Sequence, residues 1–405
     1  MVNSKKNKKK PSRGKSRIKI KEDKKQPSSS NLKVSVERQT LSCRRYEEYY
    51  DHILSYDKII ELLRKIQKRS SGKVDIVEIG KSTKEKPIYM AIISTPSCKV
   101  SSEPKFTTFI AAGLNGTNFI AVSNALFMID FLTHNQNFIT IMDYYIVPCC
   151  NPDSYDTFVR SKEPPDKKID NSNNRRTCPS LRKRQSKLPK TQSPADTTKA
   201  AICVPAEKNE SVAPMDLTFN FPVILGINDM RNIPTDLFKE KIVKWKENYL
   251  NKSPEAHTLL KTIYTYQFVI KLLISLQEGG ESICYPHGFC RAIDTDTSDL
   301  QDVGKRGQRA ICNREFSCGS IYDIRGLTYG TLIDFLKVDK LPIKYLFDIQ
   351  VHKKTPKYNE QCELTQLLRY GNDMMNCVKR MSSAVFKFYS DVLKKKEIDT
   401  KVKLR

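Results

Sequence analysis

The stretch that decides the fold reads Phe106-Thr107-Thr108-Phe109-Ile110-Ala111-Ala112-Gly113-Leu114-Asn115-Gly116-Thr117-Asn118-Phe119-Ile120. Its first seven residues are apolar or threonine, which is typical of a strand buried on both faces. Two glycines then mark a turn, and apolar residues recur at helical spacing from 121 to 132. The stretch therefore predicts a strand, a glycine turn and a helix in succession.

Further strands and helices alternate on both sides of this unit. The other expected helices lie at 56–68, at 254–266 with Ser253 as its cap, and at 364–393. The other expected strands lie at 74–79, 87–94, 145–148 and 268–276. This alternation predicts an α/β fold: one domain with a mixed, mostly parallel, twisted sheet, one antiparallel edge, and helices on both faces.

Several short motifs follow one another in a specific order. They are Ile79-Gly80-Lys81-Ser82, Pro87-Ile88-Tyr89, Asn151-Pro152-Asp153-Ser154-Tyr155, Asp216-Leu217-Thr218-Phe219-Asn220-Phe221, Tyr285-Pro286-His287-Gly288 and Ile343-Lys344-Tyr345-Leu346-Phe347. With the opening stretch, this ordered set resembles the pancreatic-type (A/B) zinc metallocarboxypeptidases from about Tyr46 to about Lys395. The resemblance implies a single metallocarboxypeptidase-like domain.

The resemblance also implies where a catalytic zinc ion would be bound. The family's His-x-x-Glu pair falls on Asn115 and Asn118, and its third ligand, a histidine eight residues before the Tyr-Pro turn, falls on Gln277. A neutral amide oxygen is a poor zinc donor beside imidazole or carboxylate, and three amides leave the charge of the ion uncompensated. We therefore expect degenerate ligand positions and no metal site of the usual kind.

The positions that recognise substrate are altered as well. The family's Asn-Arg clamp for the peptide carboxylate falls on Thr218 and Phe219, and the arginine inside the first ligand pair falls on Thr117. A permanently charged guanidinium suits that task, and these residues lack one. The remaining substrate-pocket positions are Asn151, Arg175 and Ile333, of which Ile333 matches the base of an apolar side-chain pocket.

The catalytic positions follow the same trend. Gln350 stands where the family has its general-base glutamate, and an amide cannot take a proton from water at neutral pH. Cys178 stands where an arginine polarises the scissile carbonyl, whereas Tyr322 matches the mobile tyrosine that closes over substrate. Tyr322 as a plain surface aromatic residue is the alternative. Asp348 is a candidate substitute base, but an apolar strand would require its carboxyl to be paired or neutral.

One other cluster offers metal-binding residue types. Cys284-x-x-His287-x-x-Cys290 has spacing that a metal site can use, but a structural turn is the interpretation that we prefer. No cofactor is therefore expected, and zinc would be required only if the site is active in an atypical form.

Charge is concentrated outside the expected core. The 405-residue chain has a net charge of +25, and basic residues dominate an N-terminal tail at 1–44, an insert at about 162–214 and a C-terminal tail at 396–405. The carboxypeptidase-like domain is expected at 45–395, and the tail and insert are expected to be disordered and flexible. Such segments suit an acidic or anionic partner, namely a phosphate backbone, anionic lipid headgroups or an acidic protein tail. They are also the usual form of a nuclear localisation signal. The alternative is that they only keep the protein soluble.

The sequence also bears on the compartment. Its N-terminus lacks the apolar core of a secretory signal, and no apolar run is long enough for a transmembrane segment. Cys203 matches one partner of the family's usual disulfide, but no cysteine lies near 253–255, where the other is expected. We therefore expect buried thiols and an intracellular protein, cytoplasmic or nuclear, rather than a secreted one.

Three functional hypotheses follow. The first is a carboxypeptidase-like pseudoenzyme, catalytically inactive, that acts as a binding or scaffold protein and holds a partner on its basic segments or a peptide in the relic pocket. The second is an active metallocarboxypeptidase with an atypical site. The third is a nucleic-acid-associated protein that uses the domain only as a scaffold. We prefer the first, in which the protein is not an enzyme.

Overall fold

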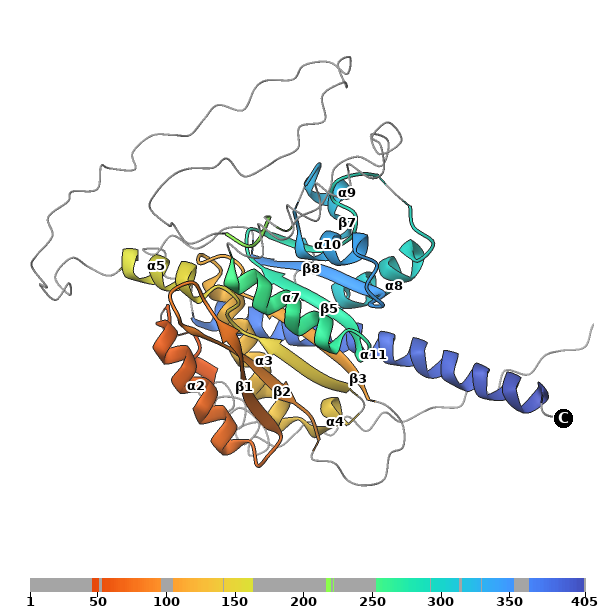
Figure 1. The fold of residues 1–405 in the computed structure, drawn as a ribbon, viewed down its shortest axis with the longest axis horizontal. Helices are drawn as coiled ribbons and strands as arrows, with labels where there is room; N and C mark the ends of the chain where they lie inside the picture. Colours follow the sequence, from red (N-terminus) through yellow and green to blue (C-terminus); the bar gives the residue numbers. More distant parts are fainter. Residues whose placement is uncertain are drawn as a thin grey trace, which may run out of the picture. The chain divides into compact units, whose positions relative to one another are not determined.

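The computed structural model describes residues 46–50, 53–95, 105–140, 142–162, 216–219, 221, 253–291, 293–312, 315–328, 330–352 and 364–403. These residues belong to one compact unit (Figure 1). The expected N-terminal tail, nearly all of the expected insert and Cys203 lie outside the described residues, as do Arg175 and Cys178.

Eight strands form a single sheet at the centre of the unit. They are β1 (Val74–Lys81), β2 (Pro87–Ile93), β3 (Phe106–Ala112), β4 (Met142–Val147), β5 (Ile270–Gln277), β6 (Gly280–Tyr285), β7 (Ser317–Ser320) and β8 (Tyr345–His352). Their order in the sheet is β1-β2-β4-β3-β5-β8-β6-β7. The central strands β4, β3, β5 and β8 are parallel, and β6 and β7 are parallel to each other. The mixed α/β sheet is confirmed, but antiparallel pairing occurs in two places, at β1-β2-β4 and at β6-β8, not at one edge alone.

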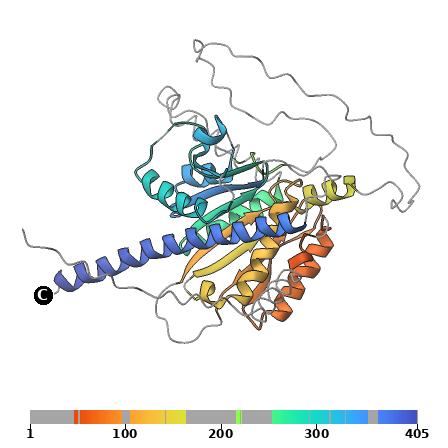
Figure 2. The ribbon, with the colours of Figure 1, turned by 180° about the vertical axis from the view of Figure 1, so that it is seen from behind.

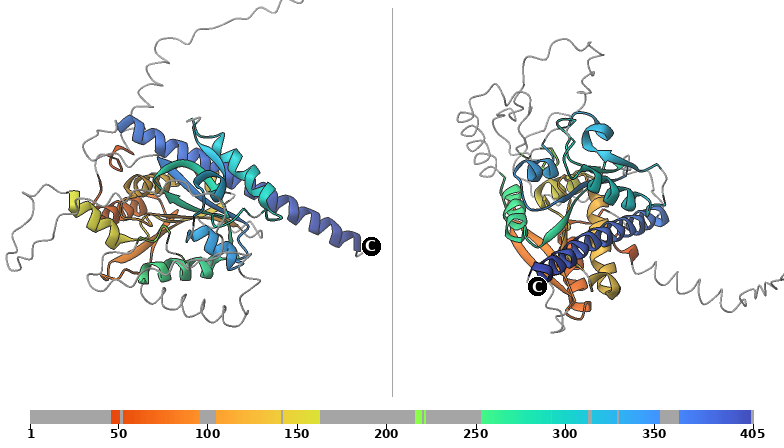
Figure 3. Two further views of the ribbon diagram at one scale, coloured as in Figure 1. Left: turned by 90° about the horizontal axis from the view of Figure 1, so that it is seen from above. Right: turned by 90° about the vertical axis from the view of Figure 1, so that its right-hand side faces the viewer.

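Helices cover both faces of this sheet. They are α2 (Tyr56–Arg69), α3 (Phe119–His134), α4 (Gln136–Ile139), α5 (Pro152–Lys162), α7 (Pro254–Tyr266), α8 (Thr297–Gln308), α9 (Ile321–Arg325), α10 (Leu332–Val338) and α11 (Leu364–Lys403). One apolar cluster joins one face of the sheet to α2, α3, α8 and α11, and a second joins the other face to α7 and α10. Figure 2 shows α11 lying across the first of these faces, and Figure 3 shows its C-terminal end reaching past the sheet.

Burial explains most of these elements. Every residue of β3 is buried, and α3 is buried around nearly its whole circumference, as expected for a strand and a helix in the middle of the domain. The helix α7 begins where expected, because the Ser253 hydroxyl accepts a hydrogen bond from the Ala256 N–H. Several predicted limits were wrong: β1 continues to Lys81, β4 begins at Met142, β5 begins at Ile270, and α11 continues past 393 to Lys403.

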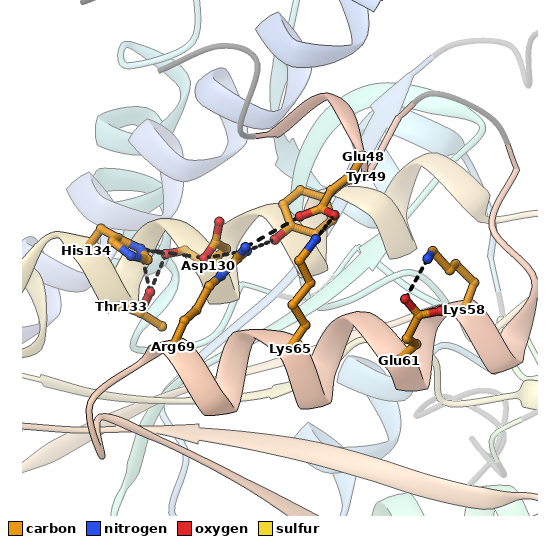
Figure 4. Close-up of polar contacts among 9 residues, drawn as sticks. All are labelled: Glu48, Tyr49, Lys58, Glu61, Lys65, Arg69, Asp130, Thr133 and His134. Carbon is orange, nitrogen blue, oxygen red and sulfur yellow. Dashed lines mark hydrogen bonds and ion pairs between the residues drawn. The ribbon is translucent and has the colours of Figure 1, made fainter. Parts of the chain in front are cut away.

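A buried charge cluster joins α2 to α3 (Figure 4). The Arg69 guanidinium lies 3.0 Å from the Asp130 carboxylate, which is fully buried, and donates to the Tyr49 hydroxyl at 2.6 Å. Glu48 approaches the same guanidinium at 3.6 Å. A buried carboxylate needs such a partner. Pairing the Asp130 charge and holding α2 against α3 are enough to account for this cluster.

Two further findings concern the cysteines and the helices. The described cysteines are all free thiols, and four of them are buried: Cys149, Cys150, Cys284 and Cys377. Across the part of the chain that the structure describes, no helix has both the length and the apolar character needed to cross a membrane.

The sheet brings the ends of three central strands together. Ala112 at the end of β3 is in register with Leu276, and Gln277 at the end of β5 is in register with Gln350 of β8. Ligands of open α/β sheets bind beyond the carboxyl ends of parallel strands. The candidate site is therefore the edge formed by the loops after β3 and β5 and by the last residues of β8.

Candidate functional site

The turn after β3 is fixed by close packing. Gly113 has a φ of +66°, and a Cβ atom added there would lie 2.9 Å from Val122 and 3.1 Å from the backbone of Cys149. The Asn151 N–H donates to the Gly113 carbonyl at 3.0 Å, which joins the loops after β3 and β4. A glycine is required at this point, and the rigid turn determines where the following asparagines lie.

Two of the three predicted ligand positions meet. The Asn118 side-chain N–H donates to the Gln277 amide oxygen at 2.6 Å, although the two residues are 159 positions apart. The Gln277 amide N–H in turn donates to the Ser275 hydroxyl at 2.7 Å. Asn118 and Gln277 are both buried, so their amides form a short series of hydrogen bonds inside the domain.

The third predicted position is bonded elsewhere. The Asn115 side-chain N–H donates to the Asp216 carboxylate at 2.7 Å, and its oxygen accepts from the Thr117 N–H at 3.0 Å. The other oxygen of Asp216 accepts from the Thr218 N–H at 2.8 Å. Asp216 therefore orients both Asn115 and the segment of the predicted clamp. Its motif was recognised in the sequence, but this role was not.

Glu278 is a site residue that the sequence analysis missed. One oxygen of its buried carboxyl accepts the N–H groups of Ile120 and Ala121, at 2.6 and 3.1 Å. These are free N–H groups of the first turn of α3, whose own N-cap, Asn118, makes no side-chain capping bond. Burial raises the pKa of Glu278 to about 8, although the two N–H groups lower it. The position next to Gln277, at the end of a buried strand, was the only signal in the sequence.

The predicted base positions lie on β8. Gln350 is partly buried, and its amide oxygen packs against Gly280, where an added Cβ atom would lie only 2.2 Å away. Asp348 is buried, and its carboxylate lies 2.6 Å from the Arg325 guanidinium. The Asp348 carboxyl was expected to be either paired or neutral, and the structure shows that it is paired, with Arg325. Its role as a substitute base stays a prediction.

The predicted substrate-pocket residues differ in exposure. Phe219 is 47% exposed, whereas Ile333 on α10 is fully buried in the core. Thr218 has a buried hydroxyl without a hydrogen-bond partner among the described residues. Asn151 is buried and caps its own turn, because its side-chain oxygen accepts from the Ser154 N–H at 3.2 Å. The structure therefore assigns a structural role to Asn151 and leaves Phe219 available to a ligand.

Tyr322 lies at the start of α9, on the surface of the domain. Its ring is partly exposed and stacks with the Arg291 guanidinium, which lies 5.2 Å from the ring centre. Its N–H donates to the His287 carbonyl at 3.0 Å. Tyr322, the predicted lid tyrosine, is thus held by this backbone hydrogen bond and by the contact of its ring with the exposed Arg291 side chain.

The cysteine and histidine cluster has another explanation. The His287 ring shares a hydrogen bond with Asp294 at 2.9 Å and lies 4.0 Å from Asp334. Within the described ranges, no three His, Cys, Asp or Glu side chains are grouped so that they could hold a metal ion. Burial raises the pKa of Asp334 to about 7, and both of its oxygens accept from the Gly288 N–H at 3.2 Å. These contacts fit the structural turn that we preferred.

A hollow of about 800 Å³ lies away from these residues, along α2. Charged side chains between Asp57 and Arg69 line it, and none of the candidate site residues belongs to this helix. We therefore place the candidate site at the ends of β3, β5 and β8.

Comparison with known proteins identifies the family and the fold. The family model described as zinc carboxypeptidase matches residues 59–376. Carboxypeptidase B2 of Bos taurus is 24% identical over 132 residues, a match that spans 31% of this chain and 30% of that protein. The chain thus matches under a third of the length of this curated relative.

Solved structures extend the likeness over most of the chain. Bovine thrombin-activatable fibrinolysis inhibitor, in complex with tick carboxypeptidase inhibitor, has a TM-score of 0.59 and 20% identity, covering 84% of this chain and 99% of that one. Carboxypeptidase A from Helicoverpa armigera has a TM-score of 0.57 and 17% identity, covering 83% of this chain and 74% of that one. At these identities the structures establish a common fold.

Proposed function

The chain belongs to the zinc carboxypeptidase family, and we propose that it is a member that binds a partner without cleaving peptide bonds. The proposal is carried by one observation, the hydrogen bond of 2.6 Å between the Asn118 and Gln277 side chains. Two positions that would have to direct donors at one ion are directed at each other.

The polar atoms of these amides are largely in use. The Gln277 oxygen accepts from Asn118 and its N–H donates to Ser275, while Asn115 bonds to Asp216 and Thr117. A zinc ion needs imidazole, thiolate or carboxylate donors at about 2.0–2.3 Å, and these three amides provide no such donor. The residues present therefore do not fit the ion, and we derive no hydrolytic step from them.

Gln350 supports the same conclusion. A general base must accept a proton near neutral pH, and a neutral amide does not do so. The neighbouring carboxylate of Asp348 is already engaged by the Arg325 guanidinium at 2.6 Å in a charge-assisted hydrogen bond.

The first test measures zinc and hydrolysis together. We expect protein purified without chelators to contain far less than one zinc ion per chain by mass spectrometry, and to release no amino acid from the C-terminus of model peptides. Asn115→His, Asn118→Glu and Gln277→His combined should bind zinc, whereas the matched alanine triple variant should not. Stoichiometric zinc in the wild-type protein, lost on changing any of the three amides, would contradict the proposal.

We also place the partner and the compartment within this proposal. The net charge of +25 favours an anionic partner that contacts the basic segments of the chain. The free thiols of the described cysteines support an intracellular location. Phe219, exposed beside the site, offers an apolar contact to a peptide.

A further inference from the structure

Exposed apolar residues gather at the end of the domain opposite the candidate site. Phe268 and Val269, in the connection from α7 to β5, are 72% and 38% exposed. Val392 and Leu393, on α11, are 36% and 38% exposed. We call these four residues the apolar end patch. An exposed apolar patch with a polar rim is typical of a surface that binds a protein or a membrane.

Contacts around Lys271 join the two parts of the apolar end patch. The Lys271 ammonium group donates to the Phe268 carbonyl at 2.6 Å and lies 5.4 Å from the centre of the Tyr389 ring. Tyr389 precedes Val392 by three positions, so both lie on the same side of α11. The Tyr389 ring also lies 5.3 Å from the ring of Phe106, the first residue of β3. The patch is therefore one surface beside the amino ends of β3 and β5.

The helix α11 extends past the domain at this patch. Val385 is the last buried residue of the helix among those described, and residues 391–394 are all exposed. The helix nevertheless continues to Lys403, and Figures 1 and 3 show its C-terminal end beyond the strands. Helices in proteins are stabilised mainly by packing of an apolar face, so an end that leaves its own domain has surface available for a partner.

The charge beside the patch is positive. Residues 387–403 of α11 include six lysines and three acids, a net charge of 6 − 3 = +3, and Lys394 is exposed at the edge of the patch. Lys271 has no carboxylate partner among the described residues. Burial lowers the pKa of Lys271, and a nearby anion would stabilise its charged form. This end of the domain therefore complements an anionic partner.

We propose that the apolar end patch, with the lysines beside it, binds the surface of a membrane that contains anionic lipids. Phe268 enters the boundary between headgroups and acyl chains, while Lys271 and Lys394 pair with the anionic groups of the lipids. The surface lies at the amino ends of the strands, away from the candidate site, so this inference goes beyond the proposed function.

A bilayer fits this surface better than two other occupants. A second copy that paired through the same part of α11 would bring two lysine-rich ends together, and these repel each other. An acidic protein segment would pair with the lysines, but Phe268 extends from a connection and Leu393 from the end of a helix. A planar partner reaches both at once. Phenylalanine and leucine with lysines beside them are also the usual composition of elements that bind at a membrane interface.

The test places a fluorescent reporter in the patch of the full chain. Trp245→Phe removes the single tryptophan, and Phe268→Trp introduces one at the patch. We expect vesicles of phosphatidylcholine and phosphatidylserine to shift the emission to shorter wavelengths, and brominated acyl chains to quench it, because the ring leaves water. Vesicles of phosphatidylcholine alone should cause little change, because they lack anionic headgroups.

The matched control is Leu327→Trp in the same background. Leu327 is 57% exposed and lies in the connection between α9 and α10, away from the patch (Figure 1). Its emission should not change with the same vesicles, even where the basic segments of the chain hold the protein near them. Equal changes at both positions, or no change in a folded Phe268→Trp protein, would overturn the proposal.

A second measurement keeps the natural tryptophan. In sedimentation with the anionic vesicles, Phe268→Ala should lower the partition coefficient of the chain roughly tenfold, because the apolar area of the ring no longer leaves water, whereas Leu327→Ala should leave it unchanged. Equal partition of the wild-type and Phe268→Ala proteins would also contradict the proposal.

The same reporter distinguishes the other occupants. An emission shift with a soluble copolymer of glutamate and tyrosine, but not with vesicles, would overturn the bilayer in favour of an acidic protein segment. A shift that grows with protein concentration in the absence of vesicles would instead indicate paired copies. None of these results depends on zinc content or hydrolysis, so a failure here is distinct from a failure of the proposed function.

Discussion

The buried carboxyl of Glu278 makes the stability of the domain depend on pH in a specific direction. Its pKa is raised from 4.5 to about 8, chiefly by burial. Below pH 4.5 the folded and unfolded states both hold the proton, so the contribution is fully present. Between pH 4.5 and about 8 only the folded state holds it, and stability therefore falls as pH rises.

The size of the effect follows from the shift. One pKa unit corresponds to about 1.4 kcal/mol, so a shift from 4.5 to about 8 corresponds to a loss of about 5 kcal/mol across that pH range. The two N–H groups at the start of α3 already act against the shift, because they favour the charged carboxylate. Glu278→Gln keeps a side-chain oxygen for these N–H groups but cannot titrate.

The assay is urea unfolding of the wild-type protein and Glu278→Gln from pH 4 to pH 9. We expect the free energy of unfolding of the wild type, taken relative to the variant at each pH, to fall steadily up to about pH 8 and then level off. Taking the difference removes other titrating groups such as Asp334, and adding Asp334→Asn to both proteins should leave it unchanged. A difference that stays flat from pH 5 to pH 8 would refute the reasoning.

Two further predictions concern recognition. Phe219 is predicted to stand at the position of the clamp arginine, so peptides with a free C-terminal carboxylate should bind no better than their amidated forms in a calorimetric titration. The missing contact is on the order of 1.5–3 kcal/mol, so a clear preference for the free acid would count against the assignment of Phe219. Residues 1–33 hold thirteen Lys or Arg and two acids, a net charge of 13 − 2 = +11. Deleting 2–33 should abolish most binding to heparin or nucleic acid, and nuclear accumulation if that is the segment's role, while leaving the Tm nearly unchanged. Binding and location that survive the deletion would point to the basic run at 175–190 instead.

Regular periodicity predicted β1 to β5 and the helices α2, α3, α7 and α11, but it did not predict β6, β7 or the other helices, and its errors at the ends of elements have physical causes. The strand β5 was expected from 268, but Phe268 is 72% exposed and lies in the connection that follows α7. An aromatic residue beside a buried run cannot be distinguished from the run by composition. The helix α11 was expected to end at 393, just before the run Lys394-Lys395-Lys396, yet it continues to Lys403. Lysine and glutamate favour helix without a core-facing stripe.

The candidate site was predictable only where the family's spacing applied. Spacing brought Asn118 and Gln277 to one place, and their side chains do meet. It could not identify Glu278, Asp216 or Arg325 as site residues. Each of these acts through contacts with residues that are distant in the sequence. The direction of a side chain is set by tertiary packing, which leaves no periodic signal.

The hydrogen bonds among the polar groups of the site explain how the fold can tolerate different side chains there. The backbone pairs between β3, β5 and β8 lie in the core and do not involve the side chains at the strand ends. Those side chains can therefore change where most buried polar groups find a partner, and among the described site residues the Thr218 hydroxyl and the second oxygen of Glu278 are exceptions. Asn118 has Gln277, Asn115 has Asp216, and Glu278 has the first N–H groups of α3. A site in which most polar groups bond to one another is held rigidly by the domain, and this explains how its side chains contribute to stability whether or not a ligand binds there.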